Sequence, residues 1–435
     1  MKKFTKITAA VMSTVILTGS ISFAAFADEI TMQIGSNVTT VNGKETAIDS
    51  APIISGERTM LPIRFIAENL GLDVEWNEDS KQITLKKATG MSIHYKTDEE
   101  IAAENNFNDN KFGLVYDGAI TENVDGEVNI HPITYNLNGI TIAANVYTPA
   151  GYDANGSTKY PAVTVAHPNG GVKEQVAGLF AQKLAENGYI AVAADAAYQG
   201  ASGGEPRMLD TPENRVNDVH GMVDLLTAFP GVDTDRIGML GICGGGGYTT
   251  KAAQTEKRAK AVATLSMFNT GIVRLNGINN SQVDTIDERL AAAAEARSAE
   301  ANGEGVQYPA ARTSSPTREE LEAMGPGLYS EGQLYYGFDY AHPNSGGSVP
   351  TKCLLDLVNF DARHNMNLIT QPLLMMAGSE ADTLYMTQDC FDLATGTDNK
   401  ELYLIEGASH IQTYYVDEYV NKEVEKLIEF LDKNL

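Results

Sequence analysis

The chain has 435 residues, of which 43% are hydrophobic and 20% are charged, a balance typical of a globular protein rather than a disordered or fibrous one. This length exceeds that of one ordinary domain, so at least two folded units are expected. With 57 acidic and 32 basic side chains the formal net charge is −25, and a surface of that sign repels phosphate backbones, which excludes nucleic acid as a partner.

The first 27 residues have the pattern of a secretory signal peptide. They begin with lysines, continue into an apolar segment and end on the small-x-small cleavage triplet Ala25-Phe26-Ala27. A membrane anchor is the alternative, but Ser and Thr interrupt the apolar segment, which is short for a span. Cleavage would leave 29 basic and 57 acidic residues, a net charge of −28, and no further stretch of transmembrane length. We expect a secreted or cell-surface protein.

Residues 28–88 read as short strands and one helix, which Pro62 opens. The motifs Arg58-Thr-Met-Leu-Pro62-Ile-Arg64, Ala67-Glu-Asn-Leu-Gly71 and Val74-Glu-Trp76 resemble those of the copper amine oxidase N-terminal-like domain. That resemblance implies a small α+β surface module, with cell-wall or surface contact as its expected role. No histidine lies in this range, so copper binding is not expected.

Residues 89–125 are polar and acidic, with Asp98, Glu99 and Glu100 followed by several asparagines. Such a composition is typical of a segment that buries little apolar surface. We interpret it as a linker, a solvated spacer with one short helix.

From residue 126 to residue 435, apolar segments of strand length alternate with amphipathic segments of helix length. A hairpin turning at Asn138-Gly139 is followed by strands at 160–166, 190–194, 236–242, 261–267, 373–377 and 402–405 and by helices at 172–187, 212–229 and 416–431. The alternation predicts an α/β fold with a doubly wound, mainly parallel sheet covered on both faces. In such sheets the chemistry takes place at the carboxyl ends of the strands.

An insertion at about 268–365 separates two of these strands. It contains helical segments and an aromatic, glycine-rich segment, and its place at a strand's carboxyl end predicts a helical cap over the site. Most of its aromatic rings are expected to pack within the cap. We assign Tyr335 and Tyr336 to substrate contact.

The segment Gly241-Ile-Cys243-Gly-Gly245 has the spacing of a nucleophile elbow, in which a strand turns sharply into a helix. The turn strains the backbone of the central residue, so the residues two positions away must lack side chains. A glycine-rich turn around a structural cysteine and a phosphate loop are the alternatives, and partners elsewhere in the chain decide between them.

A thiol nucleophile needs a base and a group that orients the base. His410 lies in the loop between the last strand and the last helix, where this architecture brings its base back to the nucleophile; an ordinary loop histidine is the alternative. The acid is expected after the preceding strand, where Asp382 is the first choice and Glu380 the second. The chain order of nucleophile, acid and histidine then fits this architecture.

Two backbone N–H groups are needed to bind an oxyanion. We assign them to Gly244, directly after the cysteine, and to Asn169 in the loop His167-Pro-Asn-Gly-Gly171. His167 is expected to be structural. Glu174 could reach the thiol, but the helix dipole explains an acid in the first turn of a helix.

Residues 126–435 resemble the α/β-hydrolase superfamily near its dienelactone-hydrolase-like branch, and more closely a group described as hydrolases or polyketide-transferase-like proteins. The motifs quoted above carry the resemblance, together with Tyr198-Gln-Gly200 and Ala377-Gly-Ser-Glu-Ala-Asp-Thr383. The resemblance implies an α/β-hydrolase fold. The dienelactone enzymes proper are smaller and lack a cap of this size.

We expect an enzyme that acts on a small-molecule ester, thioester or lactone through an acyl-enzyme on Cys243, without a metal or an organic cofactor. Activated esters and thioesters suit a thiolate better than amides do, because the thiolate is also a good leaving group. Two alternatives stay open: an acyltransferase that uses an acceptor other than water, and a catalytically idle surface-binding protein.

Three cysteines are an odd number for an exported chain. A disulfide between Cys353 and Cys390 would leave Cys243 as the free thiol. Three free thiols are the alternative.

Overall fold

The computed structural model describes residues 29–41, 44–56, 58–70, 72–78, 80–87, 90–310 and 315–435. The expected signal peptide at 1–27 lies outside these ranges. No helix within the described ranges has the combination of length and apolar character that crossing a membrane requires.

The N-terminal module is α+β, as its sequence predicts. Its elements are β1 (Ile30–Met32), β2 (Val38–Val41), β3 (Lys44–Ala47), β4 (Ile53–Ser55), β5 (Arg58–Met60), α1 (Ile63–Asn69), β6 (Leu72–Asn77) and β7 (Gln82–Lys87). β1, β2 and β3 form one antiparallel sheet, and β4–β5 and β6–β7 form two hairpins. Pro62 directly precedes α1, where its missing N–H costs the helix nothing.

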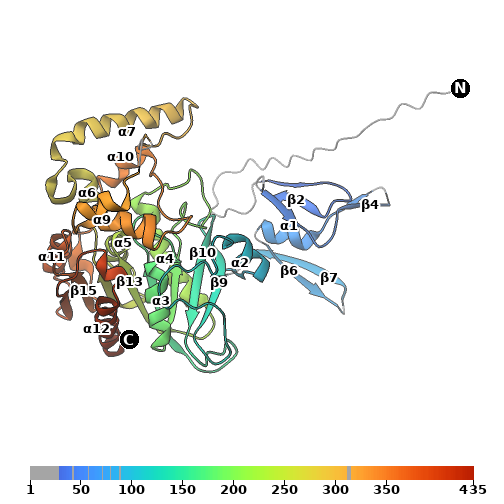
Figure 1. The fold of residues 1–435 in the computed structure, drawn as a ribbon. Helices are drawn as coiled ribbons and strands as arrows, with labels where there is room; N and C mark the ends of the chain where they lie inside the picture. The colour runs from blue at the N-terminus through green and yellow to red at the C-terminus, as the bar shows by residue number, and fades with distance from the viewer. Residues whose placement is uncertain are drawn as a thin grey trace.

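A nine-stranded sheet forms the centre of the larger domain (Figure 1). Its strands are β8 (Ile93–Tyr95), β9 (Asn129–Leu137), β10 (Ile140–Thr148), β11 (Tyr160–Ala166), β12 (Ile190–Ala194), β13 (Val232–Ile242), β14 (Ala259–Leu265), β15 (Leu373–Gly378) and β16 (Lys400–Ile405). Their order is β16-β15-β14-β13-β11-β12-β10-β9-β8; β11 to β16 are parallel, and β8, β9 and β10 pair antiparallel. The predicted doubly wound, mainly parallel sheet is confirmed.

Helices cover both faces of this sheet and enclose the core. They are α3 (Val176–Glu186), α4 (Pro212–Ala228), α5 (Gly244–Ala253), α11 (Leu384–Leu393) and α12 (Asp417–Asn434). In β13 a Cβ on Gly238 would lie 3.2 Å from Leu431 of α12, whereas one on Gly241 would lie 2.5 Å from Gly245 of α5. Residues an odd number of positions apart in a strand point to opposite faces, so α5 and α12 cover opposite faces. All of β15 and the last six residues of β13 are buried between these layers.

A helical insertion separates β14 from β15, where a cap is predicted. Its helices are α6 (Thr270–Asn276), η1 (Ile278–Asn280), η2 (Val283–Thr285), α7 (Ile286–Ala301), α8 (Arg318–Ala323), α9 (Leu328–Leu334), η3 (Tyr335–Asp339), η4 (Thr351–Cys353), α10 (Leu354–Leu357) and η5 (Met366–Leu368). α7 packs against α10 at one end of the domain (Figure 1).

Part of the segment 89–125 belongs to the larger domain, which corrects its interpretation as a solvated spacer. β8 pairs with β9 at the edge of the main sheet, and α2 (Asp98–Glu104) begins with a capping box. Phe112, Leu114 and Tyr116 are buried in the main core. Full burial of one large apolar side chain contributes about 1.5–3 kcal/mol, so a few such residues among asparagines are enough to anchor the segment.

The three cysteines are free and buried, so Cys353 and Cys390 do not form the disulfide that an odd cysteine count suggests. They belong to different elements: Cys353 ends η4 in the insertion, and Cys390 lies in α11, which packs on β15 and β16.

Candidate active site

The loops after β11 and β13 meet where the strand order of the sheet reverses. From β11 the chain proceeds to β12 on one side, and β13 to β16 follow on the other side. At such a switch point the connections leave in opposite directions and open a crevice at the carboxyl ends of the strands. The loop after β11 carries Asn169 and the turn after β13 carries Cys243.

Cys243 lies between the end of β13 and the start of α5, with φ 54° and ψ −121°. Positive φ is strained for a residue with a side chain, and nucleophile elbows have this strain. A Cβ on Gly241 would lie 2.5 Å from the carbonyl oxygen of Gly245, and a Cβ on Gly245 would overlap the carbonyl oxygen of Ala166. The predicted strand–turn–helix setting of Cys243 is therefore present, and its glycines are sterically required.

Two backbone N–H groups, those of Gly244 and Asn169, hydrogen-bond the sulfur of Cys243. They are the two groups that the sequence assigns to an oxyanion hole. The side chain of Asn169 lies over Gly244, where a Cβ would overlap its amide. The Asn169 amide donates from Nδ2 to Thr270 Oγ1 at 2.9 Å, while its Oδ1 is buried without a hydrogen-bond partner among the described residues.

The loop that carries Asn169 is held from three sides. Arg215 donates from Nη2 to the carbonyl oxygen of His167 at 3.2 Å, and the N–H of Gly346 in the insertion donates to Gly170 at 2.7 Å. The ring of His167 accepts a hydrogen bond at Nε2 from the N–H of Ala196 at 2.9 Å. His167 therefore has the structural role expected of it.

His410 is fully buried in the loop after β16. Its Nδ1 lies 2.5 Å from Oγ1 of Thr383, and its Nε2 lies 3.0 Å from the hydroxyl of Tyr414. Burial lowers the pKa of the imidazole to about 3, so the ring is neutral near pH 7. If Nδ1–H donates to Thr383, then Nε2 is the nitrogen that can accept a proton.

Neither predicted acid orients His410, which corrects the sequence assignment. Asp382 accepts a hydrogen bond at 3.1 Å from the N–H of Leu328 at the start of α9, and Glu380 is exposed. Within the described chain, His410 has no hydrogen bond or ion pair to a carboxylate, and Thr383 occupies the expected position of the acid. The physical reason is the turn after β15, in which neighbouring residues face different ways: Asp382 holds the insertion, and the next residue reaches the imidazole.

Tyr414 lies between the thiol and the imidazole. Its hydroxyl hydrogen-bonds both the sulfur of Cys243 and Nε2 of His410, and its side chain is 1% exposed. Tyr414 ends η6 (Gln412–Tyr414), four residues after His410. Sequence reasoning missed Tyr414 and Thr383, although each lies close in sequence to a residue that it singled out.

Burial raises the pKa of the Cys243 thiol. Hydrogen bonds from Tyr414, Gly244 and Asn169 oppose this shift, as does the positive charge of Arg215. Because burial prevails, the sulfur rests as a thiol. The same donors favour negative charge at this point.

The two tyrosines assigned to substrate contact have different surroundings in the structure. Tyr335 packs edge-on against Tyr414, with ring centroids 5.5 Å apart, and its hydroxyl accepts a hydrogen bond from the N–H of Val176. Burial raises the pKa of Tyr336, and Cys243 lies close enough to contribute to that shift; the buried hydroxyl of Tyr336 has no hydrogen-bond partner among the described residues. The hydroxyl of Tyr336 is thus an unpaired polar group near Cys243, whereas Tyr335 packs against Tyr414 with its hydroxyl already hydrogen-bonded.

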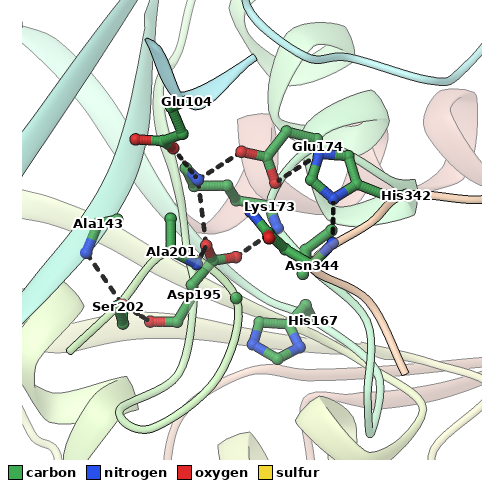
Figure 2. A network of polar contacts seen from close by, with 12 residues as sticks. Glu104, Ala143, His167, Lys173, Glu174, Asp195, Ala201, Ser202, His342 and Asn344 are labelled. Atoms are coloured by element: carbon green, nitrogen blue, oxygen red, sulfur yellow. Dashed lines mark hydrogen bonds and ion pairs between the residues drawn. The ribbon is translucent and has the colours of Figure 1, made fainter. Parts of the chain in front are cut away.

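A buried charge network lies beside the start of α3 (Figure 2). Nζ of Lys173 contacts the carboxylates of Glu104 at 3.2 Å, of Asp195 at 3.0 Å and of Glu174. Burial raises the pKa of Glu174 to about 7, and its other oxygen lies 3.9 Å from Nε2 of His342 in the insertion. The network joins α2, the residue Asp195 that follows β12, and the insertion. It also pairs the Glu174 carboxylate with Lys173.

A cavity of about 230 Å³ borders the site, with Tyr335, Tyr414, Tyr415 and Lys183 among its lining residues. Over the ranges that the structure describes, no group of three or more His, Cys, Asp or Glu side chains is arranged to hold a metal ion.

Two protein families match the chain. The copper amine oxidase N-terminal domain matches residues 13–85, and the X-Pro dipeptidyl-peptidase (S15) family matches residues 138–332. The first match agrees with the α+β module seen at the N-terminus. The second lies within the domain that carries Cys243.

Individual relatives cover the larger domain. The uncharacterised protein YcjY of Escherichia coli (strain K12) is 37% identical over 300 residues, which are 68% of this chain and 95% of YcjY. The uncharacterised protein PA2218 of Pseudomonas aeruginosa is 30% identical over 322 residues, 72% of this chain and 82% of PA2218. The crystal structure of PA2218 superposes with a TM-score of 0.63 at 27% identity, covering 72% of this chain and 96% of that chain. The α/β hydrolase GrgF from Penicillium sp. sh18 shares the fold, with a TM-score of 0.56 at 20% identity, covering 71% and 98% of the two chains.

Proposed function

Because the chain belongs to the family of YcjY and PA2218 and its larger domain has the α/β-hydrolase fold, we propose that it is a thiol-dependent hydrolase in which Cys243 attacks the carbonyl carbon of an ester, thioester or lactone. The observation that carries the proposal is the meeting of the Asn169 and Gly244 N–H groups at the sulfur of a strained elbow residue. Donors placed there lie beside the position where a carbonyl oxygen gains negative charge when sulfur attacks.

The reaction begins when the Cys243 proton passes to His410, the base of the site. The sulfur bonds to the carbonyl carbon, and the π electrons of the carbonyl move to its oxygen, which the two N–H groups hold. Collapse of this intermediate breaks the bond to the alcohol or thiol, which takes the proton from His410. A water molecule then gives a proton to the same imidazole as its oxygen bonds to the acyl carbon. The C–S bond breaks, the acid departs, and the imidazolium returns the proton to the sulfur of Cys243.

Ester and thioester substrates are favoured over amides by the nucleophile itself. A tetrahedral intermediate on sulfur can collapse either way, and a thiolate leaves more readily than an unprotonated amine does. The match to a peptidase family makes amides the competing class, so amides belong in the same assays.

The insertion supplies the substrate contact in this proposal. The unpartnered hydroxyl of Tyr336 lies near Cys243 and is free to hydrogen-bond a polar group of a small-molecule substrate. A buried polar group without a partner costs about 1–3 kcal/mol, and a bound substrate would offset that cost.

Acyl transfer to an alcohol or amine is the second candidate. The Cys243 side chain is only 7% exposed, and an enclosed acyl-enzyme restricts the access of bulk water. An acceptor that fits the site would then compete with hydrolysis. A catalytically idle binding protein is the third candidate, from a different class.

Export and surface contact complete the proposal. The pattern of residues 1–27 supports secretion, and the N-terminal module supports contact with the cell wall or another surface.

The test uses the mature chain, residues 28–435, with aryl esters, aryl thioesters and matched anilides, with and without an added alcohol. We expect ester and thioester hydrolysis that Cys243→Ala lowers at least about a thousandfold. Cys353→Ala, a change at another buried cysteine, is the matched control. Equal rates in the wild type and Cys243→Ala would support the idle protein, and ester products of the alcohol would support acyl transfer.

A further inference from the structure

The hydroxyl of Tyr414 occupies the path between the nucleophile and the base of the proposed reaction. It lies 3.0 Å from Nε2 of His410 and hydrogen-bonds the sulfur of Cys243. Within the described residues, no direct hydrogen bond joins Cys243 to His410, because Thr383 and Tyr414 occupy the two nitrogens of the imidazole. A proton that leaves the sulfur for the imidazole therefore meets the tyrosine first.

We propose that Tyr414 is a catalytic residue that relays the proton of Cys243 to His410. A phenol suits this position because its oxygen both accepts one hydrogen bond and donates another. The inference rests on the proposed thiol chemistry and adds a reacting group to it.

The relay moves two protons and leaves the tyrosine unchanged. The Sγ–H bond breaks as a new O–H bond forms on Tyr414. The original O–H bond of Tyr414 breaks as an N–H bond forms at Nε2 of His410. The sulfur becomes a thiolate and the ring an imidazolium, and Tyr414 is neutral before and after. His410 then gives its proton to the leaving group, and the reverse sequence restores the thiol of Cys243 after the acyl group has been released.

The surroundings hold Tyr414 in this position. Its ring centroid lies 5.7 Å from that of His410 and 5.5 Å from that of Tyr335, both in edge-on contact. The side chain is buried, so the phenol has little freedom to rotate out of line. Thr383 at Nδ1 fixes the other end of the relay, because a ring that donates there presents an unprotonated Nε2 to Tyr414.

The first test is a proton inventory on the wild-type enzyme, with the single-turnover rate of acylation by an aryl ester measured in mixtures of H₂O and D₂O. Two protons in flight predict a curved dependence of the rate on the deuterium fraction. A linear dependence, which indicates one proton, would overturn the relay. This measurement needs no variant and so does not depend on how a substitution folds.

The second test compares Tyr414→Phe with Tyr189→Phe, a change at another buried tyrosine, whose hydroxyl donates to Asp432 away from the site. We expect Tyr414→Phe to lower the acylation rate about a hundredfold, a typical effect of losing one proton-transfer group, and Tyr189→Phe to leave it near the wild-type value. The single variant His410→Ala and the double variant His410→Ala/Tyr414→Phe should acylate at similar rates, because the two groups act in one proton relay. An unchanged acylation rate in folded Tyr414→Phe would remove the relay.

The outcomes separate the relay from the reaction that it serves. An inactive Cys243→Ala together with a fully active Tyr414→Phe leaves the thiol hydrolase standing and removes only the relay. A fully active Cys243→Ala removes both.

Discussion

The hydroxyl of Thr383 lies 2.5 Å from Nδ1 of His410, where a carboxylate is expected from the sequence. A hydroxyl can fix the tautomer and orientation of the ring without adding charge. In the proposed reaction, the imidazolium is then less stabilised than it would be beside a carboxylate, which favours rapid return of the proton to the leaving group.

Thr383→Val removes this hydroxyl and keeps the shape of the side chain. We expect kcat/KM for an aryl ester to fall about fivefold, since the loss of one hydrogen bond is worth about 1 kcal/mol. Asp382→Asn is the matched control, because its side-chain oxygen can still accept from the N–H of Leu328. A large loss in Asp382→Asn with no loss in Thr383→Val would show that the carboxylate orients the base after all.

The buried position of His410 predicts an unusual pH dependence. Its pKa is lowered to about 3, and a lowered pKa means that the neutral, proton-accepting form persists as the pH falls. An ordinary histidine would lose its basicity below about pH 6.5. We expect kcat/KM for a non-ionisable ester to stay level from about pH 7 down to about pH 5, below the usual histidine range. An acid limb near pH 6.5 that His410→Ala abolishes would contradict this expectation.

Tyr335 and Tyr336 should respond differently to loss of their hydroxyls. Tyr335→Phe loses the hydrogen bond from Val176, so we expect the free energy of unfolding to fall by about 1 kcal/mol with KM unchanged. Tyr336→Phe removes a buried hydroxyl that has no partner in the described structure, so stability should hold or rise while kcat/KM falls. Chemical denaturation and steady-state kinetics on both variants check this contrast. Reversed effects would place the substrate at Tyr335.

The elbow glycines should tolerate no side chain. A Cβ on Gly245 would overlap the carbonyl oxygens of Ala166 and His167, so Gly245→Ala should lower the free energy of unfolding by about 1–3 kcal/mol or more. Gly332→Ala in α9 is the control, since the nearest atom to its Cβ would be 3.8 Å away and alanine favours a helix. Equal stability of the two variants would mean that the turn has another shape.

The fold and the elbow follow from local patterns in the sequence. Continuous apolar runs indicate strands that are buried on both faces. The glycines around Cys243 indicate a sharp turn, because such a turn has no room for side chains at those positions. His410 is predictable because chain order places the last loop over the sheet. Each of these predictions, for the buried strands, the elbow and the position of His410, concerns a short segment, and the structure has that feature where it is predicted.

The remaining site residues depend on loop conformations that short patterns do not encode. The conformation of a short turn after β15 decides which of Glu380, Asp382 and Thr383 faces His410. Likewise, the helical turn η6 after His410 brings the hydroxyl of Tyr414 to the imidazole. The packing of the segment 89–125 is hidden in the sequence for a related reason: Phe112, Leu114 and Tyr116 are few among polar residues, and only the tertiary fold shows that they are buried.

The most direct measurement is intact-mass spectrometry of the mature chain quenched in acid while it turns over a slowly hydrolysed aryl ester. A Cys243 nucleophile predicts a mass increase of one acyl group, located on the peptide that contains Cys243, lost on treatment with hydroxylamine and absent from Cys243→Ala. Continued turnover with no acyl group on Cys243 would contradict it.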